Sequence, residues 1–371
     1  MDVQKILHMS SGNGESSYAK NSFLQESAIR KTLPLLKRAI KGMASRDISL
    51  RKCFVIADLG CSNGTNTLLV ASTVIDIVLE LFKEDNDGHK TPQILVHLND
   101  LFGNDFNTIF QSLPIFYESL KKDKREKLSS CFVSATPGSF YDRLFPDGSL
   151  HLVHSSYALH WLSQVPEGVE NNKGTIYMSK TSPPNVFEAY GKQFRTDFKK
   201  FLQMRSEEVV SGGCMVLSFL GRSVADPTTD DCSIWEPLAQ SLHNMAKEGL
   251  IEESYINTLN IPTYFPCEEE IRDAIHDEEL FSIETLDVFR LNWDPYDTDY
   301  MSLKDLNDQN HIHGENAAKV IRAVSEPLLA SHFGKLINFD VLFKKVEKQA
   351  AKHLANKKTR HFTIVISLTR K

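Results

Sequence analysis

The spacing of apolar residues along the chain predicts that strands and helices alternate. A helical pattern covers about residues 26–45, and a second one, over 66–83, directly follows an apolar run at 53–59. Apolar runs that end in polar or glycine-rich loops predict further strands at 94–98, 131–135, 150–154 and 215–220. A helical pattern over 186–209 precedes the last of these strands. Such alternation is typical of a mostly parallel sheet, in which ligand sites form at the carboxyl ends of the strands.

The pattern changes after residue 222 and becomes mainly helical. It comprises helices over 235–246, 268–276 and 317–329, a strand over 281–289, an acidic loop over 294–315 and a last strand over 362–368. We therefore predict an α/β protein whose helical segment can cover a pocket. The expected parts are an N-terminal arm over the active site (1–25), a core (26–222), a mostly helical cap insertion (223–320), and a helix with the final core strand (321–371).

Composition and charge narrow the classes of protein to which this chain can belong. The 371 residues are 41% hydrophobic and 24% charged, which is enough apolar material for a sizeable core. The formal net charge is −6 and the isoelectric point is about 6.1. A nucleic-acid partner is therefore not expected, because phosphate binding needs a concentrated basic surface.

The cysteines and the apolar runs bear on the cellular compartment. The six cysteines include no Cys-x-x-Cys pair, which favours reduced thiols in the cytosol. The first residues lack the apolar stretch of a signal peptide. The longest apolar run, 68–82, is interrupted by Asp76 and Glu80 and is too short to span a bilayer. We expect a cytoplasmic protein with no membrane partner.

The loop after the first predicted strand is the most informative segment. Asp58 ends an apolar run, and Gly60 and Gly64 lead into a helical pattern. Glycines let the backbone approach a ligand closely, and the start of a helix leaves unpaired N–H groups. The spacing matches neither the dinucleotide fingerprint nor a phosphate loop. It suits a cofactor that carries an amine and a ribose, such as S-adenosyl-L-methionine, although a plain turn is the competing interpretation.

Three further polar sites follow predicted strands. Asp100, after the second strand, can accept hydrogen bonds from both hydroxyls of a ribose, or can cap a turn. Ser139 and Phe140 can bind and stack an adenine, or form a simple turn. Ser155 stands at the end of the fourth strand. Because such strand ends meet at one edge of the sheet, we expect these residues to lie near the Gly60 loop.

The segment 154–162 places three hydrogen-bonding rings just beyond the fourth strand. Tyr157 and Trp161 each carry one polar group on an apolar body, which is suitable for orienting a small planar ligand. His160 can serve as donor, acceptor or base, or can be a buried histidine with its own partners. Other histidines lack matched ligands at helical spacing, and no Gly-x-Ser-x-Gly elbow is present, so neither a catalytic metal nor a serine nucleophile is expected.

Several of these motifs together resemble one known family. They are Ser17–Ser22, Ile56–Ser62, Leu98–Leu101, Asn104–Asn107, Pro137–Tyr141, His160–Pro166 and the final Ile366–Leu368. The chain is similar, over essentially its whole length, to the plant salicylate, benzoate and jasmonate carboxyl methyltransferases (the SABATH family). That family also contains xanthine-alkaloid N-methyltransferases. The resemblance implies a Rossmann-like S-adenosyl-L-methionine-dependent methyltransferase fold with a helical cap, and a homodimer.

The resemblance also implies roles for individual residues. Gln25 and Trp161 would bind the carboxylate of the acceptor. In addition to Asp58 and Gly60, the residues around the cofactor would be Tyr18, Ser22, Cys61, Asn66, Asp100, Leu101, Ser139, Phe140 and Ser156. The acceptor pocket would be lined, in addition to His160, by Tyr157, Leu220, Ile234, Trp235, Tyr264, Ile321, Val324 and His361.

The sequence departs from the family pattern at several positions. Thr65 stands where proline is common, and His160 and His361 stand where salicylate-preferring members look to have methionine and an aromatic residue. Both histidines make the pocket more polar, which puts salicylate in doubt. Some relatives hold a structural magnesium near segments matching Asn172 and Asn257–Asn260, but Asn257 replaces an acid there. The resemblance therefore implies at most a structural magnesium ion, held by Asn172, Asn257 and Asn260.

We therefore predict a carboxyl O-methyltransferase that forms methyl esters of benzoate-, anthranilate- or jasmonate-like acids and releases S-adenosyl-L-homocysteine (SAH). A carboxylic acid with a pKa near ~4 is already ionised at pH 7, so no general base is required. The alternative is N-methylation of a xanthine, in which His160 or His361 relays a proton. A third interpretation is a protein that binds the cofactor without turnover.

Overall fold

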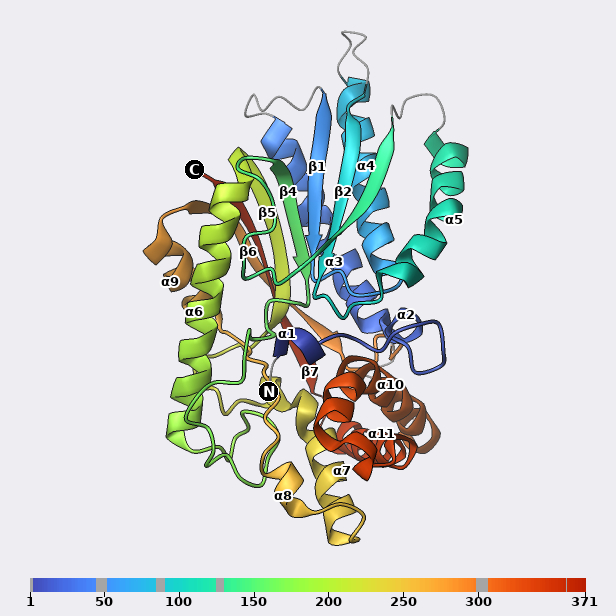
Figure 1. Ribbon diagram of the computed structural model, residues 1–371, viewed down its shortest axis with the longest axis vertical. Helices are drawn as coiled ribbons and strands as arrows, with labels where there is room; N and C mark the ends of the chain where they lie inside the picture. Colours follow the sequence, from blue (N-terminus) through green and yellow to red (C-terminus); the bar gives the residue numbers. More distant parts are fainter. Residues whose placement is uncertain (1–2, 45–51, 85–90, 125–129, 298–305, 358) are drawn as a thin grey trace.

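One mixed sheet of seven strands organises the molecule. The computed structural model describes residues 3–44, 52–84, 91–124, 130–297, 306–357 and 359–371. The strand order is β3-β2-β1-β4-β5-β7-β6 (Figure 1). The strands are β1 (Cys53–Leu59), β2 (Gln93–Asp100), β3 (Cys131–Pro137), β4 (Leu150–Ser156), β5 (Val209–Gly221), β6 (Phe281–Asn292) and β7 (Arg360–Arg370). β7 is antiparallel to both of its neighbours, and the pairs from β3 to β5 are parallel, which confirms the mostly parallel sheet.

The pleat of the central strand directs apolar side chains to both faces of the sheet. On β1, Phe54 and Ile56 belong to the core that the sheet forms with three of the helices, while Ala57 and Leu59 belong to the core on the opposite face. The helices of the first core are α3 (Phe23–Ala44), α4 (Asn66–Glu84) and α5 (Phe106–Lys124). The opposite face is covered by α6 (Pro184–Glu208) and α9 (Glu268–Glu278). Alternating side chains of a buried strand thus join both layers.

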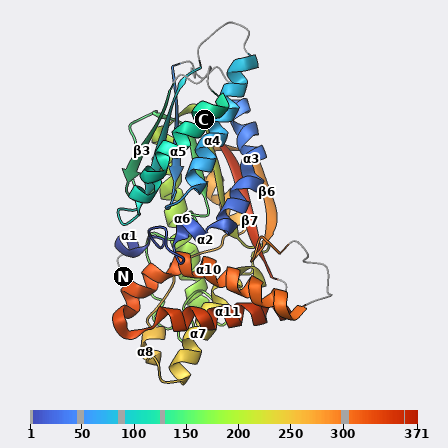
Figure 2. The ribbon, with the colours of Figure 1, turned by 90° about the vertical axis from the view of Figure 1, so that its right-hand side faces the viewer.

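A helical cap lies beyond the carboxyl ends of the parallel strands (Figures 1 and 2). It consists of the 3-10 turn η1 (Asp230–Trp235) and the helices α7 (Glu236–Lys247), α8 (Glu253–Ile256), α10 (Leu306–Phe333) and α11 (Phe339–Asn356). Two short helices of the N-terminal arm, α1 (Val3–Ile6) and α2 (Tyr18–Asn21), lie between this cap and the sheet. None of the described helices combines the length and the apolarity needed to cross a membrane.

The expected cap insertion over 223–320 needs a correction. Within that segment β6 pairs with β7 in the main sheet, and α9 packs on α6. Conversely α11, which follows residue 320, packs against α7 and α10. The cap is therefore assembled from two stretches of the chain, on either side of β6, and not from one insertion.

The predicted acidic loop over 294–315 is wrong from Leu306 onward, where α10 begins; residues 298–305 lie outside the described ranges. The polar start of α10 and its Gly314 resemble a loop in the sequence. In the structure Gly314 brings α10 close to α11, since a Cβ added there would lie 2.7 Å from the backbone nitrogen of Ala351. The contact between helices, and not local propensity, keeps this segment helical.

Candidate functional site

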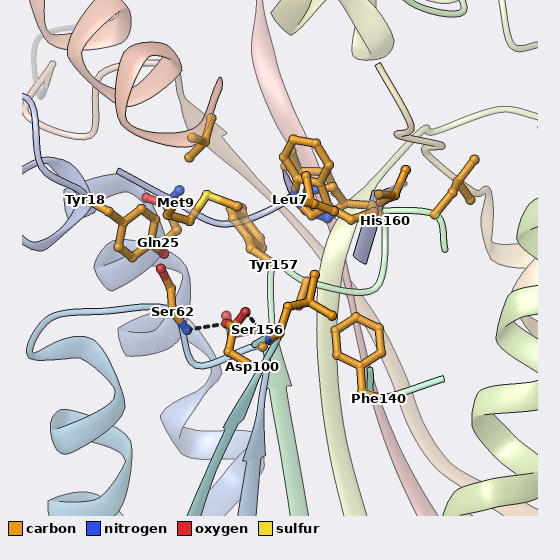
Figure 3. A pocket seen from close by; sticks show the side chains of 18 of the residues that line it. Leu7, Met9, Tyr18, Gln25, Ser62, Asp100, Phe140, Ser156, Tyr157 and His160 are labelled. Atoms are coloured by element: carbon orange, nitrogen blue, oxygen red, sulfur yellow. Dashed lines mark hydrogen bonds between the residues drawn. The ribbon is translucent and has the colours of Figure 1, made fainter. Parts of the chain in front are cut away.

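A cavity lies where the ends of β1, β2 and β4 meet the arm and the cap. It encloses about 970 Å³ of space between atoms, including the part that opens to solvent. Figure 3 shows the Asp100 carboxylate and the His160 ring projecting into it from different sides. Its described lining consists of Val3, Gln4, Leu7, Met9, Tyr18, Leu24, Gln25, Gly60, Ser62, Asp100, Leu101, Ser139, Phe140, Tyr141, Ser156, Tyr157, Ala158, His160, Trp161, Leu162, Ser163, Leu220, Ile234, Trp235, Val320 and Val324.

The loop after β1 forms one wall because its glycine permits a close approach of two chain segments. Gly60 has a φ of +73°, and a Cβ added there would lie 2.3 Å from the Cβ of Ala158. The backbone nitrogens of Gly60 and Cys61 both donate to the carbonyl of Asn99, each at 2.9 Å. Ser62 follows with a φ of +53°, which is uncommon for a residue with a side chain. The loop is thereby held against the end of β2.

Asp100 is fixed by this loop and keeps part of its hydrogen-bonding capacity. Its Oδ2 accepts from the Ser62 backbone nitrogen at 2.7 Å and its Oδ1 from the Leu101 nitrogen at 2.8 Å. Each carboxylate oxygen has a further lone pair, so two hydroxyls of a ribose can donate to it. Burial raises the pKa of Asp100 to about 6, although both backbone hydrogen bonds lower it. The side chain is therefore ionised at pH 7.

The loop after β3 forms the wall that faces Gly60. Phe140 lies against the glycine loop, 3.4 Å from the position of a Cβ at Gly60. The Ser139 hydroxyl accepts from the Tyr141 backbone nitrogen at 3.2 Å, and the Tyr141 hydroxyl donates to the Trp161 carbonyl at 2.7 Å. An aromatic face beside a hydroxyl and a carboxylate that can accept ribose hydroxyls fits a nucleoside cofactor.

The remaining walls are mainly apolar and aromatic. The rings of Trp161 and Trp235 meet edge to face at 5.9 Å, and the Trp235 indole nitrogen donates to the Thr263 hydroxyl at 3.0 Å. Tyr157 has a φ of +56°, and its hydroxyl shares a 2.6 Å hydrogen bond with Thr363 of β7. Aliphatic surface is supplied by Leu24, Leu220, Ile234, Val320 and Val324. Such a pocket accommodates a small, largely apolar molecule.

Buried polar atoms without a partner in the described structure mark where a ligand can bind. They include Gln25 Oε1, Ser62 Oγ and His160 Nδ1, all on cavity-lining residues. A buried polar group that stays unpaired costs about 1–3 kcal/mol. These atoms therefore favour a ligand with several polar groups.

His160 carries no charge in this cavity. Burial, and to a smaller extent the neighbouring His361, lower its pKa to about 3. Burial likewise lowers the pKa of His361 to about 3, but this residue does not line the cavity and stacks on Trp293 at 6.0 Å. A neutral imidazole with so low a pKa is a poor base at pH 7.

Four of the predicted cofactor residues lie behind the cavity wall. The Asn66 amide donates to the Ser22 carbonyl at 3.1 Å and to its hydroxyl at 3.0 Å, which joins the starts of α3 and α4. Both oxygens of Asp58 bind inside the core, to Thr67 and His154. Cys61 is buried within the loop itself. These residues support the wall, and a direct contact with the cofactor remains a prediction.

Three of the predicted acceptor residues also lie outside the lining. The Tyr264 hydroxyl donates to Glu270 at 2.5 Å, and Ile321 is buried in the cap core. His361 lies on β7 beside Leu291. The other predicted residues of both groups line the one cavity: Tyr18, Gln25, Gly60, Asp100, Leu101, Ser139, Phe140, Ser156, Tyr157, His160, Trp161, Leu220, Ile234, Trp235 and Val324.

The sequence interpretation predicted an N-terminal arm over the active site but did not name the apolar residues at its start. Val3, Leu7 and Met9 line the cavity, and Val3 and Leu7 are buried in the cap core. Their i, i+4 spacing was a usable signal for a helical apolar face, although the segment is short and otherwise polar. Ser62, which both holds Asp100 and presents an unpartnered hydroxyl, was also missed.

The asparagines at the expected magnesium site do not fit a metal ion. The Asn172 amide nitrogen donates to Asn260 Oδ1 at 2.8 Å, and Asn172 Oδ1 accepts from the Ser182 hydroxyl at 2.8 Å. Asn257 Oδ1 accepts from the Gly174 nitrogen at 3.0 Å. Amide oxygens already engaged, with no carboxylate in the set, are a poor site for Mg²⁺. In the described ranges no group of three or more His, Cys, Asp or Glu could hold a metal.

Comparisons with known proteins agree with this geometry. A family model described as "SAM dependent carboxyl methyltransferase" matches residues 4–371. The benzoic acid/salicylic acid carboxyl methyltransferase 3 of Petunia hybrida is 46% identical, with 100% of this chain and 99% of that protein covered. A protein of Theobroma cacao named "Probable jasmonic acid carboxyl methyltransferase 1" is 45% identical, with both chains fully covered.

A solved structure extends the agreement to three dimensions. "Loganic acid methyltransferase with SAH" superposes with a TM-score of 0.83 at 30% identity and covers 98% of each chain. Its bound SAH is the product that S-adenosyl-L-methionine leaves after methyl transfer. The predicted fold is confirmed by this match, and the Gly60 loop and Asp100 lie at the carboxyl ends of β1 and β2, the edge at which such sheets bind ligands. The chain belongs to the family of S-adenosyl-L-methionine-dependent carboxyl methyltransferases.

Proposed function

We propose that the protein methylates the carboxylate of a small benzoate-, anthranilate- or jasmonate-like acid. The observation that carries this proposal is a single cavity that contains both the Gly60–Asp100 wall and the Gln25 and Trp161 side chains among apolar walls. The names of the two carboxyl methyltransferase relatives, for benzoic and salicylic acid and for jasmonic acid, support the same class of acceptor.

The residues of the chain bind and orient the reactants. When bound, S-adenosyl-L-methionine supplies an electrophilic methyl group on a positively charged sulfur. Asp100 accepts the ribose hydroxyls, and Phe140 and Ser139 flank the adenine. Gln25, whose amide can present its NH₂ group by a half turn, and the Trp161 indole hold the acceptor carboxylate. Alignment of this kind can supply roughly 7–11 kcal/mol of the barrier.

The titratable groups favour ester formation over N-methylation. Asp100 is the single acid among the described lining residues, which include no Lys or Arg, so neutral donors hold the carboxylate. An acid with a pKa near ~4 needs no base at pH 7. A xanthine N–H must lose a proton, but His160 and His361 both have a pKa of about 3. They are therefore too weakly basic for the relay that N-methylation would use.

The proposal is tested with cofactor labelled in the methyl group and a panel of benzoate, salicylate, anthranilate, jasmonate and a xanthine. We expect a labelled product from at least one acid, with the label lost on mild alkaline hydrolysis as methanol. A product that keeps its label under alkali would support N-methylation instead. Folded protein that binds SAH but labels no acid would overturn the proposal.

The assigned acceptor contacts have their own test. Gln25→Leu and Trp161→Phe remove one donor each and keep most of the apolar volume. Each should raise the KM of the acid about 10- to 100-fold, because a hydrogen bond to a charged group contributes roughly 1.5–3 kcal/mol. The Kd of SAH should stay within about twofold in both variants. An unchanged acceptor KM would remove these residues from the carboxylate site.

We further propose a cytosolic homodimer, as the family resemblance implies. None of the six cysteines forms a disulfide, which supports a reducing compartment. Figure 2 shows the edge strand β3 beside α5. Phe132 on β3 is 52% exposed and Ile115 on α5 is 74% exposed, and these apolar side chains support an intersubunit surface there. Light scattering should give twice the chain mass, and a monomeric mass at micromolar concentration would contradict the dimer.

A further inference from the structure

An ion pair with no exposure to solvent lies beneath the loop after β3. Arg205 and Glu208, one turn apart on α6, both have side chains that are 0% exposed. Arg205 Nε donates to Glu208 Oε2 at 2.7 Å, and Nη2 donates to Oε1 at 2.9 Å. Burying two charges is costly unless every donor and acceptor finds a partner. The other hydrogen bonds of Arg205 and Glu208 therefore indicate the role of this ion pair.

Apart from Arg143 Nε, which lies 3.5 Å from Glu208 Oε1, those contacts are with the backbone of the loop 140–145. Arg205 Nη1 donates to the Phe140 carbonyl at 2.5 Å, and Nη2 donates to the Asp142 carbonyl at 2.9 Å. Glu208 Oε1 accepts from the backbone nitrogens of Leu144 at 2.6 Å and Phe145 at 3.0 Å. The two side chains thus fix four main-chain groups within six residues.

The loop held in this way carries the wall that faces Gly60. Phe140 lines the cavity and meets the ring of Phe201 edge to face at 6.2 Å, while the Arg205 guanidinium lies 5.3 Å from the centre of that same ring. Tyr141 extends the connection to the acceptor pocket, since its hydroxyl donates to the Trp161 carbonyl. A shift of the loop would therefore move the aromatic wall of the cofactor site.

We propose that Arg205 and Glu208 are positioning residues for methyl transfer, which hold the 139–145 loop in its cofactor-binding shape before the cofactor arrives. They touch neither reactant and act through Ser139, Phe140 and Tyr141. The inference depends on cofactor binding, which the family establishes, and not on the identity of the acceptor acid. If Arg205 and Glu208 prove not to position the loop, the proposed ester formation still stands. If no acid is methylated, the positioning role still stands.

Two conservative substitutions test this role. Arg205→Lys keeps the charge but lacks the planar fork that reaches two carbonyls and a carboxylate. Glu208→Gln keeps the shape but loses one acceptor oxygen. In both variants we expect the Kd of SAH and the KM of S-adenosyl-L-methionine to rise about tenfold, while kcat at saturation stays within about threefold. A merely structural pair would reduce the amount of folded enzyme and hence kcat, and would leave both constants unchanged.

Lys199→Met provides the matched control. Lys199 lies on the same helix and pairs with Asp277 at 3.0 Å, on the surface and on the side of α9. Its replacement should leave the Kd of SAH within about twofold of the wild-type value. If folded Arg205→Lys and Glu208→Gln also bind SAH as the control does, the proposal is overturned.

Hydrogen exchange in the unaltered enzyme tests the same point without any variant that must fold. The loop peptide 139–147 should already be protected without SAH, and SAH should add little protection to it. Rapid exchange of the Leu144 and Phe145 amides in the cofactor-free enzyme, slowed only by SAH, would show that the ion pair does not organise the loop in advance.

Discussion

Glycine is required at position 60 for two separable reasons, the sign of φ and the lack of space. The first prediction compares Gly60→Ala with Gly12→Ala. Gly12 has nearly the same φ, +75°, but nothing lies within 4 Å of an added Cβ. Gly12→Ala should cost only about 1–2 kcal/mol of unfolding free energy from the backbone conformation. Gly60→Ala should cost about 1–3 kcal/mol more, because its methyl would overlap Ala158.

Denaturant unfolding measures both costs, and calorimetry measures SAH binding. Gly60→Ala should also weaken SAH binding at least tenfold, since the loop must move away from Ala158, whereas Gly12→Ala should leave it within about twofold. Equal losses in the two variants would show that φ alone sets the requirement at Gly60.

Asp100 gives a pH dependence at the residue scale. Burial raises its pKa in the folded protein to about 6, from an ordinary value of 3.8. Ionising Asp100 therefore costs stability as the pH rises through this interval, and cofactor hydroxyls that donate to the carboxylate offset the cost. The second prediction is that the Kd of SAH rises as the pH falls below 6, by about tenfold at pH 5 relative to pH 7.5.

Calorimetric titration between pH 5 and pH 8 measures this effect. Asp100→Asn cannot titrate, so its Kd should be weaker than the wild-type value at pH 7.5 and should stay flat with pH. A wild-type Kd that does not change between pH 5 and pH 7.5 would contradict the ribose role of Asp100.

At the scale of elements, Asp58 joins β1 to α4 and β4. Asp58 Oδ2 accepts from the Thr67 hydroxyl at 2.5 Å, and Oδ1 lies 2.7 Å from Nδ1 of His154, its register partner on β4. The third prediction is that Asp58→Asn and Thr67→Val each lower the unfolding free energy by about 1–3 kcal/mol, because each leaves a buried group unpaired.

SAH binding separates support from direct contact. If Asp58 only supports the wall, the two substitutions should change the Kd of SAH to the same small extent. Thr67→Ser, which keeps the hydroxyl, serves as the control and should match the wild type in both measurements. A loss of affinity in Asp58→Asn alone would restore Asp58 to the cofactor contacts.

The elements differ in how far the sequence could define them. The residues 53–59 of β1 were predicted without error, because an apolar run ends at Asp58 and Gly60 on a strand buried on both faces. The helices α5 and α11 were not expected. Pro114 interrupts the pattern of α5, and the apolar stripe of α11 is defined by its contacts with α7 and α10. Where packing partners and not propensity stabilise a helix, the local pattern is weak.

At the scale of the whole molecule, the arm connects the core to the cap. The Ser10 backbone nitrogen donates to the Ala323 carbonyl of α10 at 2.9 Å, and the Ser10 carbonyl accepts from Asn63 beside the glycine loop at 3.1 Å. Gly12 donates to Asp105, after β2, at 2.9 Å. The arm is thus hydrogen-bonded both to the cap and to the loops at the carboxyl ends of β1 and β2.

The fourth prediction concerns the roof that this arm provides. Deleting residues 2–9 removes Val3, Leu7 and Met9 from the cavity wall and admits water to the reacting groups. The KM of the acceptor and the Kd of SAH should both rise at least tenfold, since several apolar contacts are lost. Steady-state kinetics and calorimetry measure these values, with Lys5→Ala, on the exposed side of α1, as the control. A deletion variant with wild-type constants would exclude a roof role.

The sequence by itself determined the alternation of strands and helices, the glycine loop at Gly60 and the acid at Asp100, because these depend on local periodicity and on single strand ends. The tertiary structure alone decided which polar residues reach the cavity. Asp58 turns inward to His154, and His361 stacks on Trp293 outside the cavity lining. These outcomes depend on contacts between residues distant along the chain, for which hydrophobic patterning carries no signal.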